Sequence, residues 1–279
     1  MISIQDKYNS LVYKIPVCNL SSHLKHPQPV LIMPFTFSHP AAVLPFNYLP
    51  KRFISMTGLV TGSMAPDFEY FIRMKDRSVY SHTWAGIFYF DLLLTIILAF
   101  LFHNLVRNDL IDNLPGFLKN RLQFVKDFNW SKHFKANFTI VVISVIIGVA
   151  THIVWDGFTH AHAQFVEIFT ILKKHVSIHG RRIPLFILMQ FFGTLIGGLI
   201  VIYAIMKLPI DKPVSTKRSI FPFWFSVSLV MLIVILIRLL TGISYRNFDD
   251  MIVVIISGGL TGLIITSLLN KLRKSKNDL

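Results

Sequence analysis

The chain has few charged residues for its length and a single cysteine. Charged side chains make up 15% of its 279 residues, whereas a soluble globular protein carries about 25%. Hydrophobic residues make up 53%, and the mean hydropathy is +0.58. This composition excludes an ordinary soluble domain and indicates an integral membrane protein. Because Cys18 is the only cysteine, an intrachain disulfide and a cysteine-rich zinc site are both excluded.

Acidic residues are scarce as well. The chain has 14 Asp and Glu residues against 28 Lys and Arg residues, and its formal net charge is +14. A strongly basic balance can indicate nucleic-acid binding, but the basic residues here lie between apolar runs. In that arrangement they set the membrane topology and contact anionic lipid head groups. We therefore expect membrane lipid as a partner and no nucleic acid.

Five apolar segments are long enough to cross a bilayer, which requires about 20 predominantly apolar residues. We predict an all-α, polytopic membrane bundle with five spanning helices at residues 84–104, 136–157, 183–206, 219–241 and 251–270. Two glycine pairs, Gly193 with Gly197 and Gly258 with Gly262, have the four-residue spacing that lets membrane helices pack closely.

The rest of the chain is less regular. The apolar stretch at 53–65 suits a short or re-entrant segment, although residues 41–65 could also form a sixth span. Residues 1–32 are polar and lack the order of a signal peptide. We expect them to be a disordered leader, or to lie upstream of a true start at Met33. The predicted organisation is this leader, a His- and Asp-containing membrane domain at 33–206, and two further helices with a basic tail at 207–279.

The charges of the loops predict an orientation. Five alternating spans place residues 105–135, 207–218 and 271–279 on one side of the membrane, and these contain 14 Lys and Arg residues. The loops on the other side, 64–83, 158–182 and 242–250, contain eight. Because cytoplasmic loops are enriched in Lys and Arg, we expect the C-terminus in the cytoplasm and the loops 64–83 and 158–182 outside.

Histidine and aspartate residues concentrate on that outer side of the predicted membrane. They fall in or beside the outer loops, or at the adjoining ends of the spans: His39, Asp67, His82, His152, Asp156, His160, His162, His175 and His179. Because the first span begins after His82 and the second ends at His152 and Asp156, topology alone brings distant parts of the sequence to one membrane face.

His152 and Asp156 form the sharpest local pattern. They are four residues apart, so they share one face at the end of a predicted helix. An imidazole and a carboxylate in that arrangement can hold a divalent metal ion, but they can equally form a structural hydrogen bond. Read singly, Asp67 suits a helix N-terminus after a proline turn. His82 suits the membrane interface, and His39 suits a turn.

Four segments carry a resemblance to a known family. They are Met33-Pro-Phe-Thr-Phe-Ser-His-Pro, Gly62-Ser-Met-Ala-Pro-Asp67, Ser81-His82-Thr83 and His152-x3-Asp156-x2-Thr-His-Ala-His162. From Met33 to about residue 200 the chain resembles the uncharacterised bacterial membrane family DUF 4184. The resemblance implies a multi-pass protein of the bacterial inner (plasma) membrane. It also favours a start at Met33, where family members begin.

The order of these residues is also similar, more distantly, to that of the zinc ligands in zinc-dependent phospholipase C and the zinc single-strand nucleases. Membrane-bound metal-dependent hydrolases show a related pattern. By this resemblance Asp67, His82 and His152 would bind one metal ion. Asp156 would bridge to a second ion, with His39 contributing there, and His162 would belong to a third position. Those enzymes complete the third position with a His-x3-acid pair, whereas this chain has His175-x3-His179.

The resemblance implies a metal-dependent hydrolase, with zinc as the expected cofactor. We expect a lipid or a phosphoester as substrate at the outer membrane face, and Asp156 as the catalytic residue that orients the attacking water. One alternative is a non-catalytic membrane protein with a structural metal ion or polar cluster. A metal or ion transporter is a weaker alternative, because such proteins place ionisable residues near the bilayer midplane. Among the ionisable residues, only Asp91 lies well inside a predicted span.

Overall fold

Helices account for almost all regular structure in the described part of the chain. The computed structural model describes residues 35–210, 219–243 and 248–277, which all belong to one unit, Leu31–Leu279. The predicted leader at 1–32 and the predicted start at Met33 lie outside the described residues.

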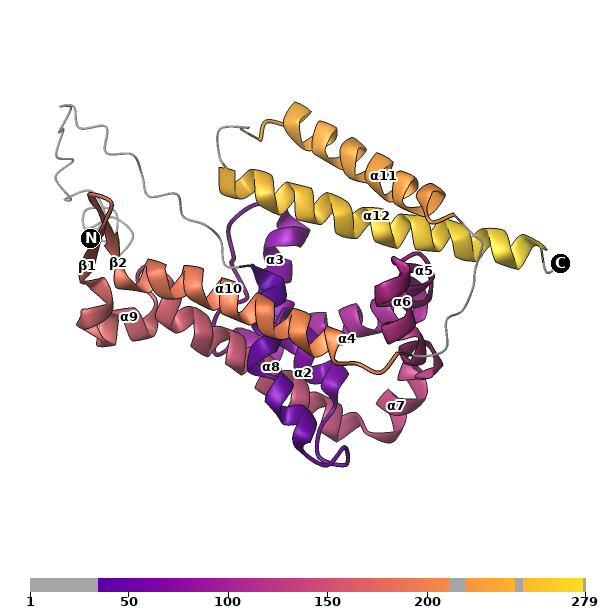
Figure 1. The fold of residues 1–279 in the computed structure, drawn as a ribbon, viewed down its shortest axis with the longest axis horizontal. Coiled ribbons are helices and arrows are strands. Elements are labelled where there is room, and N and C mark those ends of the chain that lie inside the picture. The colour runs from indigo at the N-terminus through magenta and orange to yellow at the C-terminus, as the bar shows by residue number, and fades with distance from the viewer. Residues whose placement is uncertain (1–34, 211–218, 244–247, 278–279) are drawn as a thin grey trace, which may run out of the picture. The chain divides into compact units, whose positions relative to one another are not determined.

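In the part of the chain that the structure describes, five helices are long and apolar enough to cross a membrane, which confirms the predicted helical membrane fold. They are Ile87–Asp112, Phe138–Thr159 (α8), Leu185–Met206 (α10), Phe221–Leu240 (α11) and Phe248–Asn277 (α12), and Figure 1 shows their arrangement. The first comprises two π-helical turns, the α-helix between them and a final α-helical segment: Ile87–Asp91 (η3), Leu92–Leu101 (α4), Phe102–Val106 (η4) and Arg107–Asp112 (α5).

This first helix extends beyond the predicted end at residue 104. The polar residues His103 and Arg107 are buried on it and contact each other, with Arg107 Nη1 3.2 Å from His103 Nδ1. Arg107 also donates to the main-chain carbonyls of Phe128 and Lys126, at 2.6 and 2.9 Å. Because partners satisfy these side chains inside the protein, the helix continues through a sequence too polar to face lipid.

The apolar stretch at 53–65 contributes a helix of only 7 residues, Met56–Gly62 (α2), so the alternative of a sixth complete span is wrong. Two 3-10 turns precede α2, Thr36–Ala42 (η1) and Leu44–Tyr48 (η2), and Ala65–Arg73 (α3) follows it. Ser55 caps α2 through Gly58 N–H, and its own N–H donates to Ser144 Oγ on α8 at 2.8 Å. A short helix is stable among the spanning helices because protein groups satisfy its ends.

Glycines let α2 lie directly against α8. A Cβ at Gly62 would come within 2.7 Å of the Val145 carbonyl oxygen, and one at Gly148 within 2.4 Å of the Leu59 carbonyl oxygen. Such distances leave no room for a methyl group. Close backbone packing of this kind is typical of helices in membranes, and here it holds α2 against the middle of α8.

We expect Gly148→Ala to destabilise the protein by about 1–3 kcal/mol, because the new methyl group forces α2 away from α8. The measurement is thermal unfolding of the purified protein in detergent. Gly198→Ala on α10 is the matched control, since a Cβ there meets nothing within 4 Å. Equal unfolding temperatures for the two variants would contradict the packing described above.

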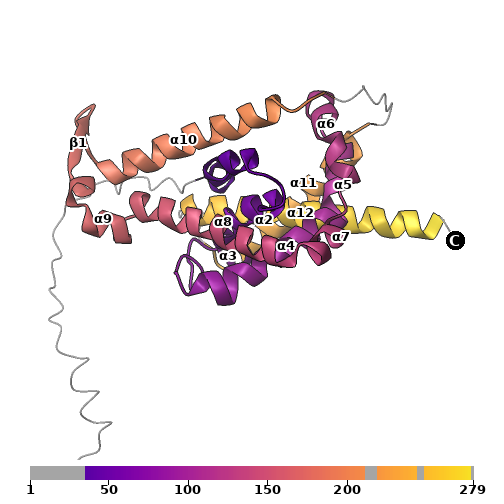
Figure 2. The same cartoon turned by 90° about the horizontal axis from the view of Figure 1, so that it is seen from below.

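The two predicted glycine pairs also lie at packing contacts, as expected. A Cβ at Gly193 would meet the Trp155 ring at 2.4 Å, and one at Gly197 would meet the Ser38 carbonyl oxygen at 2.9 Å. On α12, the second pair faces α11: a Cβ at Gly262 would lie 2.6 Å from the Val227 carbonyl oxygen. Figure 2 shows the 3-10 segment that carries Ser38 between α10 and α8, and η1 contacts both helices.

Shorter elements connect the spans. On one side lie Gly116–Leu122 (α6), the 3-10 turn Gln123–Asp127 (η5) and Trp130–Ala136 (α7). Between α8 and α10 lie Gln164–Ile168 (α9), the 3-10 turn Thr170–Lys173 (η6) and a two-stranded hairpin, His175–Ile178 (β1) with Arg181–Pro184 (β2). This hairpin was not predicted from the sequence. His179 and Gly180 both have positive φ, 49° and 75°, as tight hairpin turns require.

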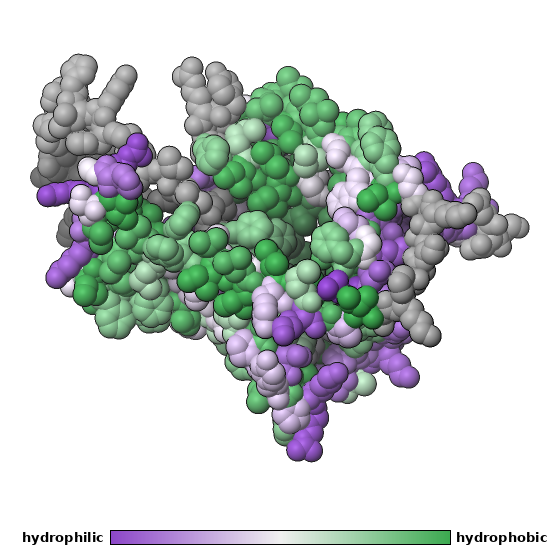
Figure 3. All heavy atoms as spheres, in the orientation of Figure 1, coloured by the Kyte–Doolittle hydropathy of each residue, from purple (hydrophilic) through white to green (hydrophobic). Residues whose placement is uncertain are grey.

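The surface agrees with a membrane environment. In Figure 3 hydrophobic residues cover α10 and α11, whereas hydrophilic residues gather around the hairpin and around α5 to α7. Large apolar side chains of α10 and α11, such as Phe191 and Leu232, are half exposed. Residues of this kind on long apolar helices suit contact with lipid tails.

Candidate metal centre

Four predicted ligands meet at the end of α8, although they come from three separate parts of the chain. Asp67 lies in the first turn of α3, His82 lies in the loop before η3, and His152 and Asp156 are one turn apart on α8. One nitrogen or oxygen atom from each of the four lies within 4.8 Å of the others. His152 is fully buried, and the side chains of Asp67, Asp156 and His82 are 2%, 10% and 17% exposed.

The spacing of these atoms suits a single metal ion. His152 Nε2 lies 3.4 Å from Asp67 Oδ1, 3.1 Å from Asp156 Oδ2 and 3.3 Å from His82 Nε2. His82 Nε2 lies 3.3 Å from Asp67 Oδ1 and 3.5 Å from Asp156 Oδ2. Tetrahedral zinc with ligands at 2.0–2.1 Å has neighbouring ligand atoms about 3.3 Å apart. These five distances are close to that value.

Buried polar atoms without partners support the same conclusion. Asp67 Oδ2, Asp156 Oδ1 and His39 Nε2 are all buried, and none has a hydrogen-bond partner among the described residues. Unpaired buried polar atoms are costly in proteins. The buried Asp–His–His–Asp group could therefore hold a metal ion, and its ligand types suit zinc.

Neighbouring serines orient the two imidazoles. His152 Nδ1 lies 2.7 Å from the main-chain oxygen of Ser63, at the end of α2. Because a carbonyl oxygen only accepts, Nδ1 carries the hydrogen, and a neutral His152 presents the lone pair of Nε2 to the cluster. His82 Nδ1 lies 2.8 Å from Ser81 Oγ. Second partners of this kind fix the orientation of metal-binding histidines.

Glu69 shapes the loop that carries His82. Its carboxylate, 1% exposed, accepts hydrogen bonds from the backbone N–H groups of Val79, Tyr80 and Ser81 at 2.8–3.0 Å, and from Arg73 Nε at 2.6 Å. Burial raises the pKa of Glu69, but these donors outweigh burial and lower it to about 2. The loop then places His82 with φ of 59°, a conformation that non-glycine residues adopt only under constraint.

The two oxygens of Asp156 face different partners. Oδ2 faces His82 and His152, whereas Oδ1 lies 3.8 Å from His39 Nε2 and 3.7 Å from His160 Nδ1. The His39 ring stacks on the His152 ring, with centroids 3.9 Å apart. A carboxylate in this position is suited to bridge two cations.

The protonation states of two predicted ligands outside the spans, Asp67 and His39, suit metal binding. Burial lowers the pKa of a third, His82, but its contacts with Asp156 and Asp67 outweigh burial and raise it, so a metal ion competes with a proton there. Burial raises the pKa of Asp67, but His152 and His82 outweigh burial and hold it well below its usual range. Burial and the neighbouring His152 lower the pKa of His39 to about 4. At neutral pH Asp67 is therefore a carboxylate and His39 is a neutral imidazole, which are the forms that bind metals.

Three predicted histidines lie outside the cluster. The side chain of His162 is 93% exposed, and its Nδ1 lies 3.4 Å from Glu167 Oε1. His175 and His179 belong to the exposed hairpin and its turn. Because α8 ends at Thr159, His162 does not share the helical face of His152 and Asp156, although it lines the same cavity as His82 and Asp156. The structure brings none of the three into contact with the four central ligands.

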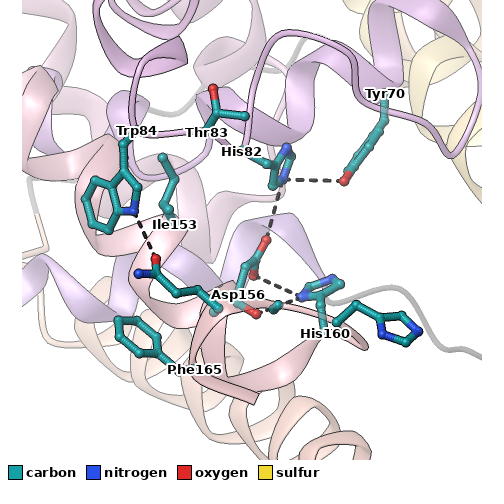
Figure 4. Close-up of a pocket in the computed structure, with 12 residues that line it drawn as sticks. Tyr70, His82, Thr83, Trp84, Ile153, Asp156, His160 and Phe165 are labelled. Carbon is teal, nitrogen blue, oxygen red and sulfur yellow. Dashed lines mark hydrogen bonds and ion pairs between the residues drawn. The ribbon is translucent and has the colours of Figure 1, made fainter. Parts of the chain in front are cut away.

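A cavity of about 510 Å³ opens beside the cluster. His82, Asp156 and His160 line its polar side together with Tyr70, and Trp84 and Phe165 line its aromatic side (Figure 4). Trp84 Nε1–H donates to Gln164 Oε1 at 3.1 Å, which joins the start of the first span to α9. The cavity connects the candidate metal centre to the exterior on the side of His82 and Asp156.

Several residues of this site do not stand out in the sequence. Nothing in the local pattern singled out Glu69, Tyr70 or Ser63, because they act through contacts between distant segments. His160 is different: the sequence placed it on the same side as the other histidines, but it was not predicted as a ligand. It follows Asp156 by four residues, the same spacing that links His152 to Asp156, and this spacing could have singled it out.

Asp91 lies inside the first span and is fully buried. Neither of its carboxylate oxygens has a hydrogen-bond partner among the described residues. It belongs to the π-helical turn η3, which packs against α8. Among the described residues, the structure thus gives the Asp91 carboxylate no hydrogen bond to a neighbouring helix.

The comparisons with known proteins agree with the family predicted from the motifs. The family described as "Domain of unknown function (DUF4184)" matches residues 33–268, a range that extends past the motifs through α10 and α11 into α12. No curated protein and no solved structure matches the chain, so the similarity to zinc-dependent hydrolases stays a prediction. Since the family match covers most of the sequence and all four central residues, the protein belongs to the DUF4184 family.

Proposed function

We propose that the protein is a metal-dependent hydrolase that cleaves a lipid or another phosphoester at the outer face of the membrane. The observation that carries this proposal is the position of the Asp–His–His–Asp group, which is buried on one side and adjoins a cavity on the other. A bound divalent ion would lower the pKa of a water molecule to about 7 and polarise a phosphoryl oxygen.

Asp67 and His152 would anchor the ion, because both are buried and held by α3 and α8. His82 and Asp156 face the cavity, so the substrate would approach from their side. The free Oδ1 of Asp156 would orient the attacking water or hold a second cation together with His39 and His160. In a phosphodiester, the water oxygen would bond to phosphorus, the bond to the leaving oxygen would break, and the leaving alcohol would take one water proton.

The surroundings of the cavity support a substrate at the membrane surface. Trp84 lies just before the first span, and tryptophan favours the boundary between head groups and lipid tails. The loops on this side also contain fewer basic residues than those on the other side. By the positive-inside rule this side is outside and the C-terminus is cytoplasmic. The aromatic side of the cavity would then contact the apolar part of a lipid.

One observation favours a second candidate function. Four protein ligands complete a tetrahedron, and closed sites of this kind are typical of structural zinc, whereas catalytic zinc keeps a position for water. In that case the ion would tie α3 and the loop of His82 to the end of α8 without turnover. The cavity beside His82 and Asp156 favours the hydrolase.

The test is hydrolysis of a panel of phospholipids and soluble phosphodiesters by the detergent-purified protein. We expect turnover that EDTA abolishes by removing the metal ion and that added zinc or manganese restores. Dialysis against buffer alone is the control. Metal-containing protein that hydrolyses no member of the panel would favour the structural role, and chelator-resistant turnover would contradict a metal-dependent mechanism.

A further inference from the structure

Tyr70 lies against the candidate metal centre but is not one of its ligands. It follows Asp67 by three residues on α3, so the two side chains lie on neighbouring positions of that helix. Its ring stacks on the His82 ring, with centroids 5.1 Å apart and an interplanar angle of 26°. Its hydroxyl oxygen lies 3.4 Å from His82 Nε2, as Figure 4 shows.

A metal ion would take away the partner of this hydroxyl group. Among the described residues, His82 Nε2 is the one hydrogen-bond partner of Tyr70 Oη. That nitrogen has a single lone pair when its imidazole is neutral, and a bound ion would use it. The hydroxyl hydrogen of Tyr70 would then need another acceptor close to the ion. Tyr70 lines the cavity together with His82 and Asp156, so that acceptor would lie in the cavity.

The chemistry of the cavity wall favours an anionic oxygen as the acceptor. A tyrosine hydroxyl, with an ordinary pKa of about 10, is a hydrogen-bond donor at neutral pH. Asp156, which also faces the cavity, is an acceptor when ionised and repels an anion. An anionic substrate would therefore need a neutral donor beside the ion, and Tyr70 provides one at the wall.

We propose that Tyr70 is a catalytic residue that donates a hydrogen bond to the phosphoryl oxygen of a phosphoester bound at the metal centre. This inference rests on the proposed hydrolase function, and it assigns the substrate an anionic phosphoryl group. Tyr70 acts as a hydrogen-bond donor throughout and transfers no proton. It stabilises negative charge on the phosphoryl oxygen, as donors in oxyanion sites do.

The test compares Tyr70→Phe with wild type and with Tyr89→Phe. The phenylalanine retains a ring that can stack on His82 and removes only the hydroxyl group. Tyr89 is the matched control, because it is 58% exposed and its hydroxyl donates to the Tyr80 carbonyl oxygen outside the cluster. Each protein is assayed for bound metal, for binding of inorganic phosphate by calorimetry, and for phosphodiester hydrolysis.

We expect Tyr70→Phe to keep its metal, to bind phosphate about 10- to 100-fold more weakly and to lose a similar factor in kcat/KM. Tyr89→Phe should match wild type. Unchanged phosphate affinity in Tyr70→Phe, or loss of its metal, would overturn the inference. The phosphate measurement needs no turnover, so metal-loaded protein that binds phosphate through Tyr70 but hydrolyses nothing would contradict the hydrolase and retain the binding role. Wild type without metal would overturn both.

Discussion

Replacing His152 by alanine is expected to abolish metal binding by the purified protein. His152 is fully buried, and its Nε2 lies within 3.5 Å of the nearest ligand atoms of Asp67, His82 and Asp156. Its Nδ1 is already engaged with the Ser63 carbonyl oxygen, so the ring has one orientation. Removing the imidazole takes away a central ligand, so the affinity for a metal ion falls. It also leaves two buried carboxylates with fewer partners, which lowers the stability of the protein.

The measurement is elemental analysis of zinc, manganese and iron per protein molecule after purification in detergent. His175→Ala is the matched control, because His175 lies on the exposed hairpin and has the same side chain. Asp67→Asn is a second variant that changes the charge of a ligand and little of its shape, and it should also lower the metal content. A wild-type protein with no more metal than His152→Ala would contradict the metal centre.

Glu69→Ala is expected to weaken metal affinity by about 10- to 100-fold, although Glu69 is not itself one of the four ligands. The substitution leaves the N–H groups of Val79, Tyr80 and Ser81 without their acceptor. The loop then loses the contacts that hold His82 in its left-handed conformation. His82 no longer faces His152 in a fixed position, so the ion loses part of the free energy that a preformed site provides.

Metal titration of the chelator-treated protein measures this effect. Glu167→Ala is the control, because Glu167 is an exposed carboxylate that pairs with Lys173. An excess of metal should restore occupancy in Glu69→Ala but not in His152→Ala, since only the second variant lacks a central ligand. Wild-type affinity in Glu69→Ala would show that the loop does not depend on Glu69 for its position.

The membrane fold could be predicted from local sequence, because each span depends mainly on its own hydropathy. The predicted spans differ from the observed helices chiefly at their ends. The first helix continues through His103 and Arg107, since carbonyl groups distant in sequence satisfy Arg107. The sequence alone specifies the short helix α2 less clearly. Its length excludes a full span, but only its packing through Gly62 and Gly148 shows why it is stable.

The candidate site could be predicted only in part. The four-residue spacing of His152 and Asp156 places them on one helical face, and this is evident from the sequence. The order of the spans predicts Asp67 and His82 on the same side of the membrane. Whether those two reach α8 depends on α2 packing, on Glu69 and on the backbone of His82. Such contacts join segments up to 89 residues apart, and local patterns do not encode them.

By itself the sequence determined that this protein has five apolar segments of spanning length and that it carries the DUF4184 motifs, and it predicted that its histidines and aspartates gather toward one membrane side. Only the tertiary structure decided which of those side chains meet. It placed His160 beside Asp156, directly after the end of α8 at Thr159, and left the side chain of His162 exposed. Hydropathy specifies which segments enter a bilayer, whereas a ligand set requires angstrom-scale contacts that exist only once the helices have packed.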